Sequence, residues 1–255
     1  MKTIRVEGFL ERLAEELVLL YLRLNGYLML GGYLLHRSVE QREGLRTEID
    51  ALAVRFPNQR EPLHDGPHPE QPNDPLLVLP RECGLIDFVV AEVKTGKKRP
   101  RFNDALFRYD EESRQNLLDV LSMLGCFAEE SELREAVECL LAELQSVPPN
   151  QPIAYMLKDG RTKIRFLLFW DPSGRKQDNR FFISLSHVLE FVEMRTRPGT
   201  SCAAYSRWHA KWRGLARHIL EAMDEVRSKG KVHGNLKHLE EHLLHRLGSE
   251  AVEFF

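Results

Sequence analysis

Two stretches of this chain have the apolar character of buried β-strands and yet carry several charged side chains. The first is TEIDALA at 47–53, and the second is DFVVAEVKTG at 87–96. Burying a carboxylate without a partner is costly, because the charge loses its hydration. The folded chain must therefore place these charges beside one another, beside a cation or in contact with water.

Hydrophobic periodicity and turn signals predict alternating strands and helices around these two stretches. The predicted strands are 27–36, 45–56, 86–94, 153–158, 161–170 and 181–184. The predicted helices are 8–24, 110–127, 131–145, 186–195, about 203–228 and 235–247. This order predicts an α/β fold with a central mixed β-sheet flanked by helices, and with extra helices at the C-terminal end.

Local signals mark several boundaries of these elements. Asn25-Gly26 can terminate the first helix, and Gly31-Gly32 indicates a bulge or a bend in the first strand. Asp159-Gly160 is a strong turn signal between the two strands of a hairpin. Ser186 is the predicted N-cap of the helix at 186–195.

The segment at 57–85 is predicted to be a long loop, because seven prolines fall within 57–82. No regular element is expected there. The expected domain organisation is a first domain at 1–195 that contains this loop, followed by a C-terminal helical extension at 196–255 that packs on it.

Composition limits the classes of function. The formal net charge is −2, so any basic surface for nucleic acid must be local. The four cysteines include no CxxC pair, which argues against a zinc ribbon. With few cysteines, no signal peptide and no apolar run long enough to span a bilayer, we expect a cytoplasmic protein without a membrane partner.

The charged residues of the two stretches suggest a metal site. Glu92 and Lys94 are two residues apart, so they point to the same face of a strand. If the strands at 45–56 and 86–94 pair, Asp50 can lie beside Glu92. Two adjacent carboxylates repel each other unless a cation neutralises them, and Mg²⁺ (or Mn²⁺) suits oxygen ligands. The chemistry indicated is metal-assisted hydrolysis of a phosphodiester, with Lys94 beside the metal.

These motifs resemble the PD-(D/E)XK nuclease superfamily, which has an acidic residue on one core strand and Glu-X-Lys on the next. The branch that includes Holliday-junction resolvases is the most similar. There, a helix with a glutamate precedes a Gly-Tyr pair, as Glu15 precedes Gly26-Tyr27 here. The resemblance spans residues 15 to 96, and Ile49 stands where the family name has proline.

The resemblance implies a restriction-endonuclease-like core and assigns roles to individual residues. Asp50, Glu92 and the carbonyl of Val93 would bind the metal, and Glu15 would reach it directly or through water. Lys94 would be catalytic. The strand at 161–170 would extend the sheet.

Other residues are candidates for supporting roles. Glu48 shares a strand face with Asp50, either beside the site or exposed to solvent. Gln115 lies on the helix after the lysine strand, where some families of this type place a glutamine. A basic run follows the site and would contact phosphates or form a solvated loop; it comprises Lys97, Lys98, Arg99 and Arg101.

The sequence therefore predicts a metal-dependent nuclease, most simply a DNA endonuclease. The alternative is a catalytically silent nucleic-acid-binding or protein-interaction subunit. DNA repair and phage defence are the settings we expect, with a protein partner in a larger complex as a further hypothesis. A homodimer is also a hypothesis, because duplex cleavage often needs two active sites.

Overall fold

The computed structural model describes residues 8–36, 45–57, 59, 73–82, 84–96, 102, 104–108, 110–146, 152–171, 182–196, 215–228 and 236–247. The chain divides into two compact units. Unit 1 comprises Met1–Gly26, Arg60–Val78 and Ser184–Phe255, and unit 2 comprises Tyr27–Gln59 and Leu79–Ile183.

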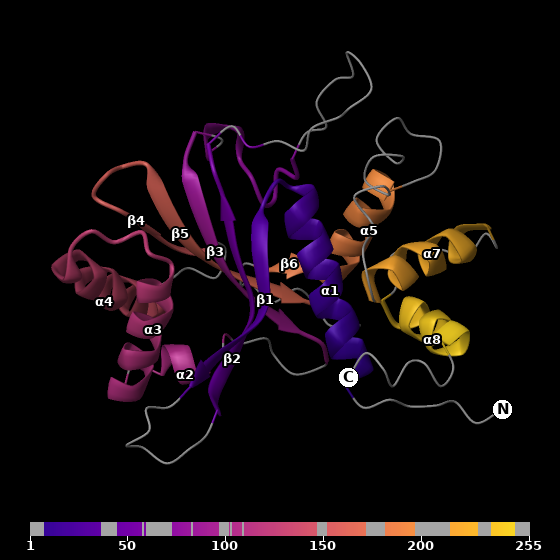
Figure 1. Ribbon diagram of the computed structural model, residues 1–255, viewed down its shortest axis with the longest axis horizontal. Helices are drawn as coiled ribbons and strands as arrows, with labels where there is room; N and C mark the ends of the chain where they lie inside the picture. Colours follow the sequence, from indigo (N-terminus) through magenta and orange to yellow (C-terminus); the bar gives the residue numbers. More distant parts are fainter. Residues whose placement is uncertain are drawn as a thin grey trace. The chain divides into compact units, whose positions relative to one another are not determined.

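The sheet contains six strands among the described residues and is mixed and open (Figure 1). The strands are β1 (Leu28–His36), β2 (Leu45–Arg55), β3 (Ile86–Lys94), β4 (Ile153–Met156), β5 (Thr162–Trp170) and β6 (Ile183–Ser184). Their order is β1-β2-β3-β5-β4, and β6 pairs with β5. The predicted α/β class with a mixed sheet flanked by helices is confirmed.

Strand direction follows from the connections between the strands. β1, β2 and β3 form an antiparallel meander, and β3 pairs with β5 in parallel. Parallel neighbours need a crossover connection, and the chain between β3 and β5 contains helices. The strand predicted at 161–170 thus extends the sheet beside β3, as expected.

Three helices belong to unit 2 and gather on one side of its sheet (Figure 1). They are α2 (Asp104–Phe107), α3 (Glu111–Met123) and α4 (Glu130–Ser146). Asp110 caps α3, since its side chain accepts a hydrogen bond from the Ser113 amide at 2.8 Å. Leu117, Leu140 and Phe166 are buried together in the core between these helices and the sheet. Each such leucine stabilises the fold by roughly 1.5–3 kcal/mol when fully buried.

The hairpin predicted around Asp159-Gly160 is confirmed as β4 and β5, which pair antiparallel. Gly160 has a positive φ of 63°, which a residue with a side chain would adopt only with strain. The Asp159 carboxylate accepts hydrogen bonds from the amides of Arg161 (2.7 Å) and Thr162 (2.9 Å). The hydrogen bond from the Arg161 amide is the main reason that the pKa of Asp159 is lowered.

The described part of unit 1 is mainly helical. Its helices are α1 (Phe9–Leu24), α5 (Leu185–Thr196), α7 (Leu215–Ser228) and α8 (Leu236–Leu247). Leucines recur along α1 at helical spacing, and four of them are buried while Leu10 is half-buried; the buried ones are Leu13, Leu17, Leu20 and Leu24. The part of the predicted helix at 203–214 lies outside the described residues.

Two details of the prediction are wrong. The helix α5 begins at Leu185, and its cap is Ser184 rather than Ser186, because the Ser184 hydroxyl accepts a hydrogen bond from the His187 amide at 3.1 Å. The proline-rich segment is not wholly irregular, since Pro80–Glu82 forms a short 3-10 helix, η1. A single 3-10 turn tolerates a proline at its first position, because no amide donor is required there.

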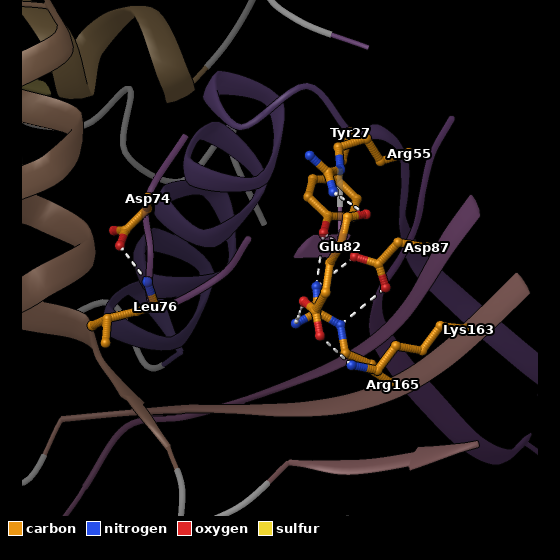
Figure 2. A network of polar contacts seen from close by, with 8 residues as sticks. All are labelled: Tyr27, Arg55, Asp74, Leu76, Glu82, Asp87, Lys163 and Arg165. Atoms are coloured by element: carbon orange, nitrogen blue, oxygen red, sulfur yellow. Dashed lines mark hydrogen bonds and ion pairs between the residues drawn. The ribbon is translucent and has the colours of Figure 1, made fainter. Parts of the chain in front are cut away.

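A buried aspartate holds the end of the proline-rich segment in unit 1. Asp74 is 2% exposed, and its Oδ1 accepts a hydrogen bond from the Leu76 amide at 2.9 Å (Figure 2). Its Oδ2 accepts the Tyr21 hydroxyl at 2.9 Å and lies 2.5 Å from His187 Nε2. These contacts satisfy a carboxylate that would otherwise be costly to bury.

In the part of the chain that the structure describes, we find no helix that combines the length and the apolar character needed to cross a membrane.

Candidate functional site

The pairing of β2 with β3 brings the two predicted carboxylates onto neighbouring strands. The antiparallel register of β2 and β3 ends at the pair Ala51–Ala91, so Asp50 and Glu92 are the next residues on these two neighbouring strands. The condition on which the predicted site depended, that these strands pair, is therefore met.

Asp50 is fixed by a backbone contact across the two strands. Its Oδ2 accepts a hydrogen bond from the Val93 amide at 2.6 Å, and the residue is half-buried. A carboxylate held by a strand amide has less freedom to rotate than one on a loop. The contact also brings the Asp50 carboxylate next to the peptide bond between Glu92 and Val93.

Glu92 and Lys94 form an ion pair on one face of β3, as their spacing predicts. The two members differ in exposure: the side chain of Glu92 is 6% exposed and that of Lys94 is 44% exposed. A buried carboxylate thus meets an ammonium group whose stem reaches solvent. This combination leaves the charged centre accessible from one side.

The end of β5 holds the segment that follows Lys94. Lys94 is in parallel register with Trp170, and the Lys94 carbonyl accepts a hydrogen bond from the Asp171 amide at 3.4 Å. The indole of Trp170 donates to the Gly96 carbonyl at 3.1 Å, and Trp170 is 3% exposed. Gly96 has a positive φ of 126°. Because β3 and β5 are parallel, their ends meet at one edge of the sheet and fix the exit of the chain from the site.

Glu48 lies two residues before Asp50 on β2 and is exposed. Its Oε1 lies 3.3 Å from the position that a Cβ atom would occupy at Gly32, whose φ is +62°. Gly32 therefore leaves room for the Glu48 carboxylate beside the strand. A residue with a side chain at position 32 would reduce that room. The supporting role of Glu48 stays a prediction.

The remaining predicted residues are not brought to the site by the described contacts. Glu15 belongs to unit 1, where its Oε2 lies 3.1 Å from Arg12 Nη1, and its place in the site stays a prediction. Gln115 is exposed on α3 and donates to Asp119 of the same helix at 2.8 Å. The basic run of Lys97, Lys98, Arg99 and Arg101 lies outside the described residues.

The neighbouring residue Glu16 is also on α1 and shares its cationic partner, Arg12, with Glu15. Burial raises the pKa of Glu16, and the positive charge of Arg12 partly offsets that effect. Arg12 Nη2 lies 3.6 Å from Glu16 Oε1, so one guanidinium serves both glutamates. The sequence alone does not determine which of the two glutamates, Glu15 or Glu16, would reach the metal.

Within the described ranges, no group of three or more His, Cys, Asp and Glu side chains is arranged to hold a metal ion. Asp50 and Glu92 nevertheless provide two carboxylates on neighbouring strands, and Asp50 contacts Val93, the residue after Glu92. Mg²⁺ is commonly held by one or two carboxylates and retains several waters for substrate phosphates. The donor set of oxygen atoms therefore fits Mg²⁺ or Mn²⁺ in its chemistry.

A second charged cluster in unit 2 was not predicted from the sequence. Asp87, at the start of β3, is 1% exposed and accepts a hydrogen bond from Arg165 Nε at 2.9 Å (Figure 2). The Tyr27 hydroxyl donates to Asp87 and accepts from Arg165 Nη2 at 2.9 Å. Lys163 Nζ lies 2.5 Å from Glu82 Oε1. Asp87 is five residues from Glu92, about 16 Å along a strand, so the two clusters are separate.

The contacts within this cluster shift the pKa values of its members. Burial, followed by the charge of Asp87, raises the pKa of Tyr27. Burial opposes the charged form of Arg165, but the charge of Asp87 outweighs it and raises the pKa of Arg165. Burial would also raise the pKa of Glu82, yet the hydrogen bond from Lys163 and the charge of Arg165 lower it.

Arg55, at the end of β2, completes the cluster. It is 1% exposed, and its guanidinium lies over the Tyr27 ring, 5.6 Å from the centroid. The available signal in the sequence was a charged residue inside or at the end of three apolar strands, at Arg55, Asp87 and Arg165. That signal predicts that these charges are buried, but it does not predict which charged residues contact one another.

No family model matches the chain, and no match was found among curated proteins or solved structures.

Proposed function

We propose that this protein is a metal-dependent nuclease, most simply a DNA endonuclease, with Asp50, Glu92 and Lys94 in its active site. The single observation that carries the proposal is the hydrogen bond from the Val93 amide to Asp50, which holds a second carboxylate beside the residue that follows Glu92. Lys94 forms an ion pair with Glu92. A structural ion pair needs one carboxylate and one cation, whereas a metal site would use the second carboxylate as well.

Each residue has a definite proposed role. Asp50, Glu92 and the Val93 carbonyl would hold Mg²⁺ or Mn²⁺, and Glu15 stays a ligand that the family resemblance alone suggests. When bound, the metal supplies Lewis-acid polarisation of a phosphate oxygen and a nucleophilic water at neutral pH. Lys94 orients that water or stabilises negative charge on the phosphate, because an ammonium is a compact positive charge with three donors.

The sheet topology supports the proposed restriction-endonuclease-like core. A helix precedes an antiparallel meander of three strands, and a further strand, β5, lies parallel to the strand that carries Glu92 and Lys94. The proposed core therefore has the acidic residue and the Glu-X-Lys motif on adjacent strands. A homodimer that presents two such sites would suit a duplex substrate.

The test is cleavage of plasmid DNA and of labelled DNA and RNA oligonucleotides with Mg²⁺ or Mn²⁺ and with EDTA. We expect metal-dependent cleavage of DNA, and a loss of about 10³-fold or more in kcat/KM for Asp50→Asn, Glu92→Gln and Lys94→Met. Glu135→Gln on α4 is the matched control, because Glu135 also pairs with a lysine, Lys158, but at an exposed position. Wild-type cleavage by Asp50→Asn would remove the assignment.

A further inference from the structure

The ion pair between Glu92 and Lys94 has a consequence for metal binding. The Glu92 side chain is 6% exposed, so its charge cannot be stabilised mainly by water. Lys94 supplies the compensating positive charge through direct contact with Oε1 of Glu92. Lys94 is thus the internal counter-ion of a buried carboxylate.

The same carboxylate is the one that a divalent cation would use in the proposed site. An ammonium group and a divalent cation on one carboxylate repel each other, and this repulsion is strong where water is partly excluded. Asp50 is held by the Val93 amide and cannot turn away without losing that hydrogen bond. The member that can move is Lys94, whose side chain is 44% exposed.

We infer that metal binding displaces the Lys94 ammonium from Glu92 and thereby releases it toward water and substrate. This inference rests on the proposed function and deepens it. Lys94 keeps Glu92 compensated when the metal is absent, and it becomes available for the phosphate when the metal is present. The availability of Lys94 is therefore coupled to metal occupancy.

A second buried lysine–glutamate pair in unit 2 provides the comparison. Lys163 contacts Glu82, with side chains 17% and 10% exposed, and Arg165 Nη1 lies 3.8 Å from the same glutamate. The other carboxylate of this cluster, Asp87, pairs with the same Arg165, so side-chain cations compensate both carboxylates. Lys163 is thus a structural counter-ion, and the loss of Tm caused by its substitution should not depend on metal.

The experiment measures thermal unfolding of the full chain, without metal and with saturating Mn²⁺, and the Kd of Mn²⁺ by calorimetry. Lys94→Met should lower the Tm without metal, because Glu92 loses its counter-ion. That loss should largely disappear with Mn²⁺, since the metal then replaces Lys94 in both proteins. By linkage, Lys94→Met should bind Mn²⁺ about tenfold more tightly than wild type.

Two further variants make the result specific. Lys94→Arg keeps the positive charge and should have a Kd for Mn²⁺ close to that of wild type. Lys163→Met is the matched control, and its loss of Tm should be the same with and without Mn²⁺. If Lys94→Met does not fold, Lys94→Gln removes the charge while keeping a donor for Glu92, and the same tightening is expected.

Failure of the inference and failure of the proposed function give different results. An equal loss of Tm with and without Mn²⁺, together with an unchanged or weaker Kd in Lys94→Met, would overturn the displacement of Lys94. The proposed function would survive that result if wild type binds Mn²⁺ and Asp50→Asn does not. Wild type that binds no Mn²⁺ would overturn both.

Discussion

The two ends of β3 carry charged clusters that differ in what surrounds each carboxylate. At the start of the strand, Asp87 is enclosed by the Arg165 guanidinium and the Tyr27 hydroxyl, and its contacts are inside the protein. At the end of the strand, Glu92 pairs with Lys94, whose side chain is 44% exposed, and another carboxylate, Asp50, accepts the amide of the next residue, Val93.

The difference shows how the same residue types separate into structural and chemical roles. At Asp87 the cations and hydrogen-bond donors converge on the carboxylate, which is the arrangement that makes a buried charge tolerable. At Glu92 there is one lysine contact, and Asp50 is held at the next residue of β3, so in the proposed site the two carboxylates would share a divalent cation. We therefore attribute stability to the first cluster and chemistry to the second.

Arg165→Met should produce the largest effect on stability. It leaves Asp87 buried without its main cationic partner, and breaking a buried pair typically costs about 3–5 kcal/mol of unfolding free energy. Urea unfolding followed by circular dichroism measures this change. Arg134→Met is the control, because Arg134 forms an exposed pair within α4 and should cost roughly 0.5 kcal/mol or less. Equal losses of unfolding free energy in Arg165→Met and Arg134→Met would contradict the structural role of the cluster.

Lys163→Met should have a smaller, pH-dependent effect. At pH 7 the variant should lose about 1.5–3 kcal/mol, the usual contribution of a hydrogen bond to a charged group. The folded pKa of Glu82 is lowered by the hydrogen bond from Lys163 and by Arg165, against the effect of burial. This stabilisation is therefore complete above about pH 4.3, the unfolded value for glutamate, and is lost as pH falls through the lower folded pKa.

The measurement for Lys163→Met is urea unfolding of wild type and variant between pH 3 and pH 7. The gap in unfolding free energy between them should narrow on acidification, because protonated Glu82 no longer forms the ion pair in wild type. A gap that stays constant, or widens, as the pH falls would contradict the assignment of Lys163 as the counter-ion of Glu82.

Asp50→Asn should have the smallest effect on stability. The amide oxygen of asparagine can still accept from the Val93 amide, and the repulsion between Asp50 and Glu92 is removed, so the unfolding free energy should change by less than about 1 kcal/mol. Chemical unfolding without metal checks this. A loss comparable with that of Arg165→Met would indicate that Asp50 belongs to a structural cluster after all.

The central elements could be predicted because the rules that set them are local. The apolar run at 86–94 became β3 with the same bounds, and the spacing of Glu92 and Lys94 determined that they share a face. β2 and β3 are consecutive strands, and consecutive strands are usually neighbours in a sheet even where, as here, a long loop joins them. These rules place Asp50 near Glu92 without knowledge of the rest of the chain.

The charged network at the start of β3 could not be predicted in the same way. Asp87 and Arg165 are 78 residues apart, and their contact depends on which strand lies beside β3. The N-cap of α5 was misassigned because Ser184 and Ser186 offer the same hydroxyl group, and only the position of the first helical turn distinguishes them. The contribution of Glu15 depends on tertiary structure in a similar way.

The most direct test of the proposed metal site is a crystal of the protein soaked with Mn²⁺, followed by location of the metal from its anomalous scattering. We expect Mn²⁺ bound between the carboxylates of Asp50 and Glu92 and in contact with the Val93 carbonyl. The Lys94 ammonium should no longer contact Glu92. Saturating Mn²⁺ that binds elsewhere, or that leaves these two carboxylates without metal, would contradict the proposed metal site.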